Sequence, residues 1–150
     1  MKLWVLRHGE AEPYGARPDS ERALTDRGRK EVLSSAARLM GEPLTAIYAS
    51  PYLRAQQTAQ LVREALDFEP EIRTVEWLTP NTDPDKVAEQ LVSVSNVLLV
   101  SHNPLVGNLL SYLQHGAGGP PEKVSTAGLA ELEHSELLVG SMKLNSLKHS

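Results

Sequence analysis

The chain has 150 residues, no cysteine, 41% hydrophobic residues and a formal net charge of −4 at pH 7. These values argue against nonspecific nucleic-acid binding, which needs a basic surface, and they exclude disulfides and thiolate chemistry. No apolar run approaches the roughly 18 residues of a membrane span, so we expect no membrane partner and a soluble, cytoplasmic protein. From the length and composition we expect residues 1–150 to form one domain with an aliphatic core, and from the charge we expect no nucleic-acid partner.

Apolar runs that predict strands alternate with helical segments in the first half of the chain. A charged segment rich in proline and glycine follows the first strand and predicts a loop. Thr25 is an expected N-cap, and Ser50 as N-cap with Pro51 as the first helical residue predicts a second helix start. The expected order is strand 2–6, loop 10–23, a helix from Thr25, strand 45–49 and helix 51–66.

The same alternation continues in the second half and then changes. The expected elements are strand 71–75, a helix over 83–93, strand 96–100, a helix over 104–113, a loop at 116–121 and two short strands at 125–133 and 136–144. Alternating strands and helices predict an α/β fold with a mostly parallel sheet. The two strands at the end predict an antiparallel addition at the sheet edge.

Polar residues suited to phosphate chemistry follow the first apolar run, at Arg7-His8-Gly9. Arginine presents a planar fork of donors that matches phosphate oxygens. Histidine, with a reference pKa of about 6.5, is an available nitrogen nucleophile near neutral pH. Glycine lets the backbone approach a ligand closely. On its own the tripeptide is weak evidence, since such residues are often only solvated surface.

A second arginine and a second histidine occupy corresponding places further along the chain. Arg54 lies near the start of the helix that follows strand 45–49, and His102 follows strand 96–100 directly. The carboxyl ends of parallel strands meet at one edge of a sheet, where ligands of open α/β folds bind. We therefore expect Arg7, His8, Arg54 and His102 to converge in one crevice.

Three stretches of the chain resemble the signature of the histidine phosphatase superfamily: an Arg-His-Gly tripeptide, a later arginine and a later histidine. They are residues 6–11 (LRHGEA), 49–58 (ASPYLRAQQT) and 100–107 (VSHNPLVG). Residues 24–28 resemble the family's first helix start, and the short length and residues 76–80 are most similar to its SixA-type phosphohistidine phosphatases. The resemblance implies a three-layer α/β/α fold of the phosphoglycerate mutase type.

The resemblance also implies how the four residues act. His8 would attack phosphorus and form a phosphohistidine enzyme, from which water releases inorganic phosphate. Arg7, Arg54 and His102 would bind the phosphoryl oxygens. Two guanidinium groups also disfavour protonation of His8. Because the arginines supply the positive charge, we expect neither a metal nor another cofactor.

The substrate class depends on whether the site has a general acid. Larger relatives place an acidic residue after the second histidine or in an inserted segment, whereas here Asn103 follows His102 and no long insertion is present. An alkoxide leaving group needs a proton, but protonated phosphohistidine releases neutral imidazole. The pattern favours a phosphohistidine substrate, and the sequence leaves Glu10, Glu12 and Glu76 open as rival acids.

The expected substrate is a histidine-phosphorylated protein. Only the loops at 10–23 and 115–125 are available to wall the pocket, so a histidine projecting from a folded partner would enter; the resemblance suggests a phosphocarrier or phosphotransfer domain. Two alternatives remain open. A phosphomonoesterase with the same nucleophile would turn over small phosphate esters or phosphoproteins, whereas a phosphoryl carrier would hold phosphate on His8 without turnover.

Overall fold

The computed structural model describes residues 1–15, 17–135 and 139–149. The strands within these residues form one sheet in the order β3-β2-β4-β1-β5-β6. Four of them are parallel: β1 (Lys2–Arg7), β2 (Ala46–Ala49), β3 (Arg73–Thr74) and β4 (Val97–Ser101). The other two, β5 (Leu129–Glu133) and β6 (Lys143–Lys148), are antiparallel and close one edge. The predicted mostly parallel sheet with an antiparallel edge is confirmed.

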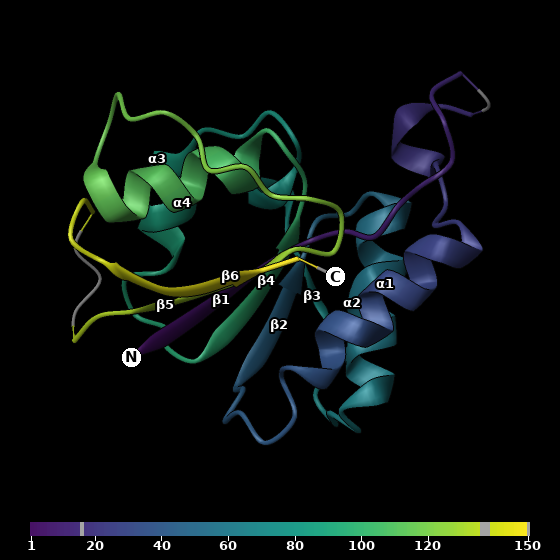
Figure 1. The fold of residues 1–150 in the computed structure, drawn as a ribbon, viewed down its shortest axis with the longest axis horizontal. Coiled ribbons are helices and arrows are strands. Elements are labelled where there is room, and N and C mark those ends of the chain that lie inside the picture. Colours follow the sequence, from purple (N-terminus) through teal and green to yellow (C-terminus); the bar gives the residue numbers. More distant parts are fainter. Residues whose placement is uncertain (16, 136–138, 150) are drawn as a thin grey trace.

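Helices cover both faces of the sheet, which confirms the predicted three-layer fold (Figure 1). One face carries α1 (Asp26–Ala37) and α2 (Leu53–Ala65), and the other carries α3 (Pro84–Gln90) and α4 (Leu105–His115). Two short 3₁₀ helices, η1 (Asp19–Glu21) and η2 (Glu76–Leu78), lie in the connections. None of the helices in the described part of the chain is long and apolar enough to cross a membrane.

The core consists of two apolar layers separated by the sheet. Successive residues of β1 point to opposite faces, as the pleat requires. Trp4 and Leu6 therefore pack with α1 and α2, whereas Leu3 and Val5 pack with α3 and α4. A central strand buried on both faces fixes its register strongly, because a slip of one residue would exchange every side chain between the two layers.

The sheet brings the ends of three neighbouring strands to one edge. Hydrogen bonding continues one residue beyond them: the His8 N–H donates to the Ser101 carbonyl at 3.0 Å, and the Ser50 N–H donates to the Val100 carbonyl at 3.1 Å. Since β2, β4 and β1 are adjacent in the sheet, Ser50, His102 and His8 lie side by side at the carboxyl edge of the sheet.

The first helix start is predicted correctly and the second is not. The Thr25 hydroxyl oxygen accepts a backbone hydrogen bond and caps α1, as expected. Helix α2 begins at Leu53 with Tyr52 as its N-cap, so Pro51 lies outside it. The Ser50 hydroxyl accepts a hydrogen bond from the Tyr52 N–H at 3.2 Å but does not cap the helix, because Ser50 sits two residues too early.

Both antiparallel strands begin later than the predicted strands 125–133 and 136–144. Ala127, with φ of +55°, leaves the extended conformation just before β5, and Gly140, with φ of +85°, turns the chain before β6. These left-handed residues interrupt the ladder at points where the apolar pattern alone suggests continuous strands. Residues 136–138 of the second predicted strand lie outside the described residues.

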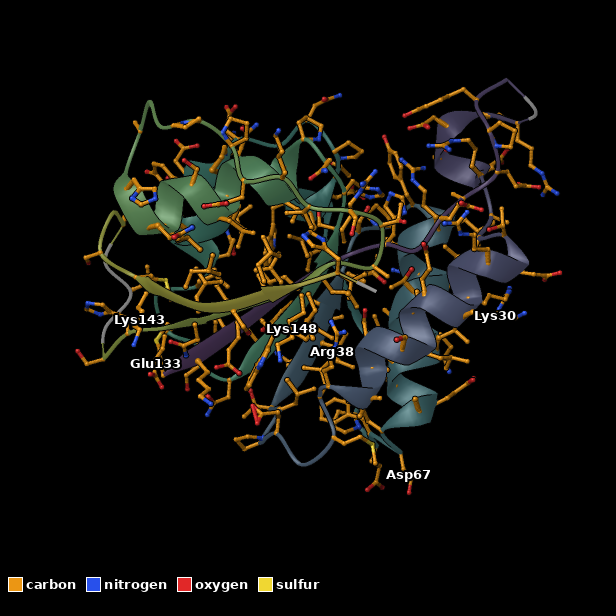
Figure 2. The ribbon with its side chains drawn as sticks, viewed as in Figure 1. Lys30, Arg38, Asp67, Glu133, Lys143 and Lys148 are labelled. Carbon is orange, nitrogen blue, oxygen red and sulfur yellow. The ribbon has the colours of Figure 1, made fainter. Side chains whose placement is uncertain are left out.

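Both ends of the described chain are tied to the fold. The Met1 ammonium donates to the His134 carbonyl at 2.8 Å. Arg38, one residue after α1, donates to the His149 carbonyl at 3.1 Å, and Figure 2 labels Arg38 close to Lys148. The strand that closes the sheet edge is therefore joined to the helical layer through a side chain.

We expect Gly28→Ala to lower the free energy of unfolding by about 1–3 kcal/mol, the usual cost of overpacking. A Cβ at Gly28 would lie far inside van der Waals distance of the Glu10 carbonyl oxygen. Helix propensity alone would favour alanine by about 1 kcal/mol. A lower free energy of unfolding would therefore come from the contact of the new Cβ with the Glu10 carbonyl oxygen. Urea unfolding measures it. The matched control is Ser34→Ala, an exposed position of α1, and an equal loss there would contradict the explanation.

Candidate active site

The four residues that the sequence predicts for the site lie together at the carboxyl edge of the sheet. The ring centroids of His8 and His102 are 5.1 Å apart, and Arg54 Nε lies 3.3 Å from His8 Nε2. His8, Arg54 and His102 are 6, 3 and 1% exposed. Arg7, the last residue of β1, lies close enough to contribute to the electrostatics of both histidines. The predicted convergence is therefore observed.

His8 is held as a neutral imidazole whose Nε2 lone pair accepts a hydrogen bond from Arg54 Nε at 3.3 Å. Nδ1 lies 2.7 Å from the Gly9 carbonyl oxygen, which can only accept, so Nδ1 carries the proton and Nε2 the lone pair. Burial lowers the pKa of His8 from 6.5 to about 3, and the positive charges of Arg54 and Arg7 add to this against the opposing hydrogen bond to Gly9. A neutral, oriented nitrogen nucleophile results.

The loop at 10–23 supplies two further charged residues that the sequence did not single out. Arg54 donates to the Asp19 carbonyl at 2.6 Å and to its carboxylate at 3.3 Å. The same carboxylate accepts from Arg22 Nε at 2.9 Å, and Arg22, itself buried, donates to the Glu12 carbonyl at 2.6 Å. A loop without periodic pattern gives no signal for which of its charges turn inward.

Arg7 is held by the segment that precedes β5. Its Nη1 donates to the Val124 carbonyl at 3.0 Å, and its backbone N–H donates to the Gly128 carbonyl at 3.0 Å. The Ala127 N–H donates to the His8 carbonyl at 2.9 Å. The backbone from Val124 to Gly128 therefore forms one wall of the site.

His102 is packed on two sides. Its Nε2 lies 2.7 Å from the Ser50 hydroxyl, and the Tyr52 ring meets it edge-on with centroids 5.1 Å apart. Burial lowers the pKa of His102 to about 2, and the nearby His8 and the charge of Arg54 lower it further. The ring is therefore uncharged at neutral pH and donates from only one of its nitrogens.

Two buried polar atoms of this cluster, Arg7 Nε and His102 Nδ1, have no hydrogen-bond partner among the described residues. Buried donors without a partner are rare and costly, and these two belong to the set expected to bind phosphate. A tetrahedral oxyanion seated beside His8 Nε2 would accept a hydrogen bond from Arg7 Nε, and another from His102 Nδ1 if that nitrogen carries the proton of the ring. Among the described residues, no three or more His, Cys, Asp or Glu side chains gather as a candidate metal site.

Of the three glutamates proposed as rival acids, two are engaged elsewhere. Glu10 Oε1 accepts from the Thr25 hydroxyl at 2.9 Å, and Glu12 Oε1 accepts from the Ala23 N–H at 2.8 Å. Glu76 is exposed at the start of η2. Glu10 and Glu12 therefore support the helix start and the loop.

Asp19 is the carboxylate in contact with Arg54, and it is ionised at neutral pH. Partial burial raises its pKa, but the hydrogen bond from Arg22 and the charge of Arg54 outweigh this and hold the pKa below its usual value. An ionised carboxylate accepts protons but has none to donate. Asp19 is therefore suited to pairing with the arginines and unsuited to acid catalysis.

Two polar side chains fix the backbone around the site. The Thr58 hydroxyl accepts from the Gly9 N–H at 3.2 Å and donates to the Arg54 carbonyl at 2.8 Å, which joins the loop after His8 to α2. Asn103 donates to the Val124 carbonyl at 3.0 Å. Where larger relatives are expected to carry an acid, this chain has an amide that ties down the wall beside Arg7.

The chain belongs to the histidine phosphatase superfamily (branch 1), whose model matches residues 3–78. It is 33% identical over 142 residues to the phosphohistidine phosphatase SixA of Escherichia coli strain K12, covering 90% of this chain and 88% of that one. A SixA homolog from Haemophilus influenzae is 35% identical over 127 residues, covering 75% of this chain and 77% of that one. The solved structure of the protein histidine phosphatase SixA complexed with tungstate is similar over 99% of this chain and 97% of that one, with a TM-score of 0.88 and 31% identity.

We expect the ring signals of His8 and His102 to stay constant from about pH 8 to pH 5, because both pKa values lie far below the ordinary value near 6.5. NMR spectra assigned with His8→Asn and His102→Asn measure this. As the pH falls below about 6.5 the unfolded chain takes up protons that the folded chain refuses, so the free energy of unfolding falls toward pH 3. A titration midpoint near 6.5 for either ring would contradict the assignment.

We expect Asp19→Asn to strengthen the binding of tungstate or phosphate at pH 7 by about three- to tenfold, because it removes a negative charge that contacts Arg54. Isothermal titration calorimetry measures the affinity. Glu21→Gln is the matched control, since Glu21 lies in the same 3₁₀ helix and is exposed. Weaker binding in Asp19→Asn, or an equal gain in both variants, would show that the contact does not oppose the anion.

Proposed function

We propose that this protein is a phosphohistidine phosphatase that removes phosphate from a histidine-phosphorylated protein through a phospho-His8 intermediate. His8 Nε2 forms a bond to phosphorus as the bond between phosphorus and the substrate imidazole breaks. Water then attacks phosphorus, the bond to Nε2 breaks, and inorganic phosphate leaves. His8, Arg7, Arg54 and His102 are the catalytic residues, and the last three also bind the phosphoryl oxygens.

The observation that carries this proposal is the contact of His8 Nδ1 with the Gly9 carbonyl oxygen, which leaves Nε2 without a proton. The proton of the ring lies on Nδ1, against the Gly9 carbonyl, and its unprotonated Nε2 accepts a hydrogen bond from Arg54 Nε at 3.3 Å. The lowered pKa keeps Nε2 unprotonated well below neutral pH. An incoming phosphoryl group would therefore meet an unprotonated nucleophile, and Arg54 would exchange its contacts with His8 and Asp19 for the phosphoryl oxygens.

The carboxylates around the site favour a nitrogen-linked substrate. Protonating an alkoxide needs an acid that holds a proton at neutral pH. Asp19 is ionised beside the arginines, and Glu10 and Glu12 take part in contacts of the helix start and the loop. A protonated phosphohistidine releases neutral imidazole, whose conjugate acid has a pKa near 6.5, so it leaves without that help.

The comparisons support the same substrate class. Two similar proteins that match three quarters or more of this chain are named a phosphohistidine phosphatase and its homolog, and the solved relative is described as a protein histidine phosphatase. The chain covers more than three quarters of each of them. The relatives named serine/threonine-protein phosphatases match only 45% of this chain. A phosphocarrier or phosphotransfer domain is the proposed partner, because such domains present a phosphorylated histidine on a folded surface.

We expect rapid phosphate release from a histidine-phosphorylated carrier protein, slow release from an alkyl phosphate, and a loss of about 10³-fold or more in His8→Ala, since removing a nucleophile abolishes the covalent path. Phosphate release and ³²P labelling of the enzyme measure both steps. Preferential turnover of the alkyl phosphate would reject the substrate assignment. Label held on His8 without release would make the protein a phosphoryl carrier.

Glu76→Gln tests whether cleavage proceeds without a general acid or uses Glu76 as one. Glu76 is exposed and lies outside the set of side chains described at the site. We expect turnover of the phosphoprotein to change by less than about twofold in this variant. A loss of ester hydrolysis with phosphohistidine hydrolysis intact would identify Glu76 as the acid of a secondary esterase activity.

A further inference from the structure

The buried hydroxyl of Ser50 contacts the imidazole of His102, and the reaction described above gives it no part. Ser50 and His102 leave the neighbouring strands β2 and β4, and they are 0 and 1% exposed. Ser50 Oγ lies 2.7 Å from His102 Nε2. The Ser50 N–H continues the sheet ladder to Val100, so the backbone that carries the hydroxyl is fixed by the sheet.

The protons of this pair decide which nitrogen of His102 donates. Ser50 Oγ has two contacts among the described residues, the Tyr52 N–H at 3.2 Å and His102 Nε2. A proton on Nε2 would leave both the serine hydrogen and the Nδ1 lone pair buried without a partner, which native structures avoid. With Ser50 as donor, Nε2 accepts and Nδ1 carries the proton.

The choice of tautomer matters because His102 is uncharged. A neutral imidazole has one N–H and one lone pair. If the lone pair lay on Nδ1 of His102, this unpartnered nitrogen would repel the oxygens of a phosphoryl group held by Arg7 and Arg54. If the proton lies there, the same atom donates a hydrogen bond to one of those oxygens.

We propose that Ser50 is a positioning residue that holds His102 in its Nδ1–H tautomer, so that the ring donates a hydrogen bond to the bound phosphoryl group. Ser50 touches neither phosphorus nor the nucleophile and acts only through His102. The consequence for turnover rests on the proposed function. The tautomer and its effect on oxyanion binding do not depend on that function.

A neighbouring serine provides the matched control. Ser101 is also buried, directly precedes His102, and donates its hydroxyl to the Leu78 carbonyl at 2.7 Å. Ser101→Ala therefore removes a buried hydroxyl and its hydrogen bond at the same sheet edge without removing a partner of the imidazole. Any effect specific to the His102 ring must distinguish Ser50→Ala from Ser101→Ala.

The first test is ¹⁵N NMR of the His102 ring in the wild-type protein and both variants at pH 7. We expect a protonated Nδ1 and an unprotonated Nε2 in the wild type and in Ser101→Ala, and a shift toward the Nε2–H tautomer in Ser50→Ala. A protonated Nε2 in the wild type would overturn the proposal, even if Ser50→Ala failed to fold.

The second test measures tungstate affinity by calorimetry and kcat/KM for the phosphoprotein. We expect Ser50→Ala to weaken both by about tenfold, the effect of one hydrogen bond to a charged group, and to have less than a twofold effect in a His102→Gln background. Equal losses in the two backgrounds would overturn the proposal, because Ser50 would then act independently of His102. If the wild-type protein binds tungstate but releases no phosphate, the proposed function is wrong. The tautomer and the tungstate affinity would still decide whether Ser50 positions His102.

Discussion

The neutral state of a deeply buried His8 is the constraint on which the rest of the site depends. An imidazolium there would have to lose its hydration and lie against guanidinium groups, so the fold keeps the lone pair on Nε2. The backbone that holds the ring is clamped from both sides. Gly9 lies so close to α1 that a Cβ would come 2.5 Å from the Gly28 carbonyl oxygen, and Thr58 joins the Gly9 N–H to α2.

Burial keeps the nucleophile uncharged and the nearby cations add to this effect. Those cations have partners of their own within the protein. Arg7 meets the Val124 carbonyl, Arg22 meets a carbonyl of the 10–23 loop, and Arg54 meets both the backbone and the carboxylate of Asp19. The carboxylate compensates the positive charge only in part, because Asp19 is substantially exposed and screened by water. An entering phosphoryl group would take over this role and replace one anion with another.

The convergence of Arg7, His8, Arg54 and His102 could be predicted from the sequence, because it follows from local patterns. Apolar runs mark the parallel strands, and His8 and His102 come directly after two of them. The predicted cap at Ser50 is wrong, although a serine before a proline is a strong cap signal, because α2 begins only at Leu53. The contact of Ser50 with His102, distant in the chain, gives no local signal. Asp19 and Arg22 could not be predicted either. The contact of Asp19 with Arg54 is long-range, and the pairing of Arg22 with Asp19 lies in a loop that has no periodic pattern.

The site divides between two kinds of support. His8, Ser50 and His102 follow strands whose ladder hydrogen bonds fix their backbones, whereas the loop at 10–23 reaches the site through contacts of Asp19 with Arg54. Sequence drift in that loop can therefore alter which phosphorylated surface fits the protein while the reactive groups keep their mutual geometry. Proteins with this architecture can acquire different partners through changes in a surface loop, while the catalytic residues and their geometry stay the same.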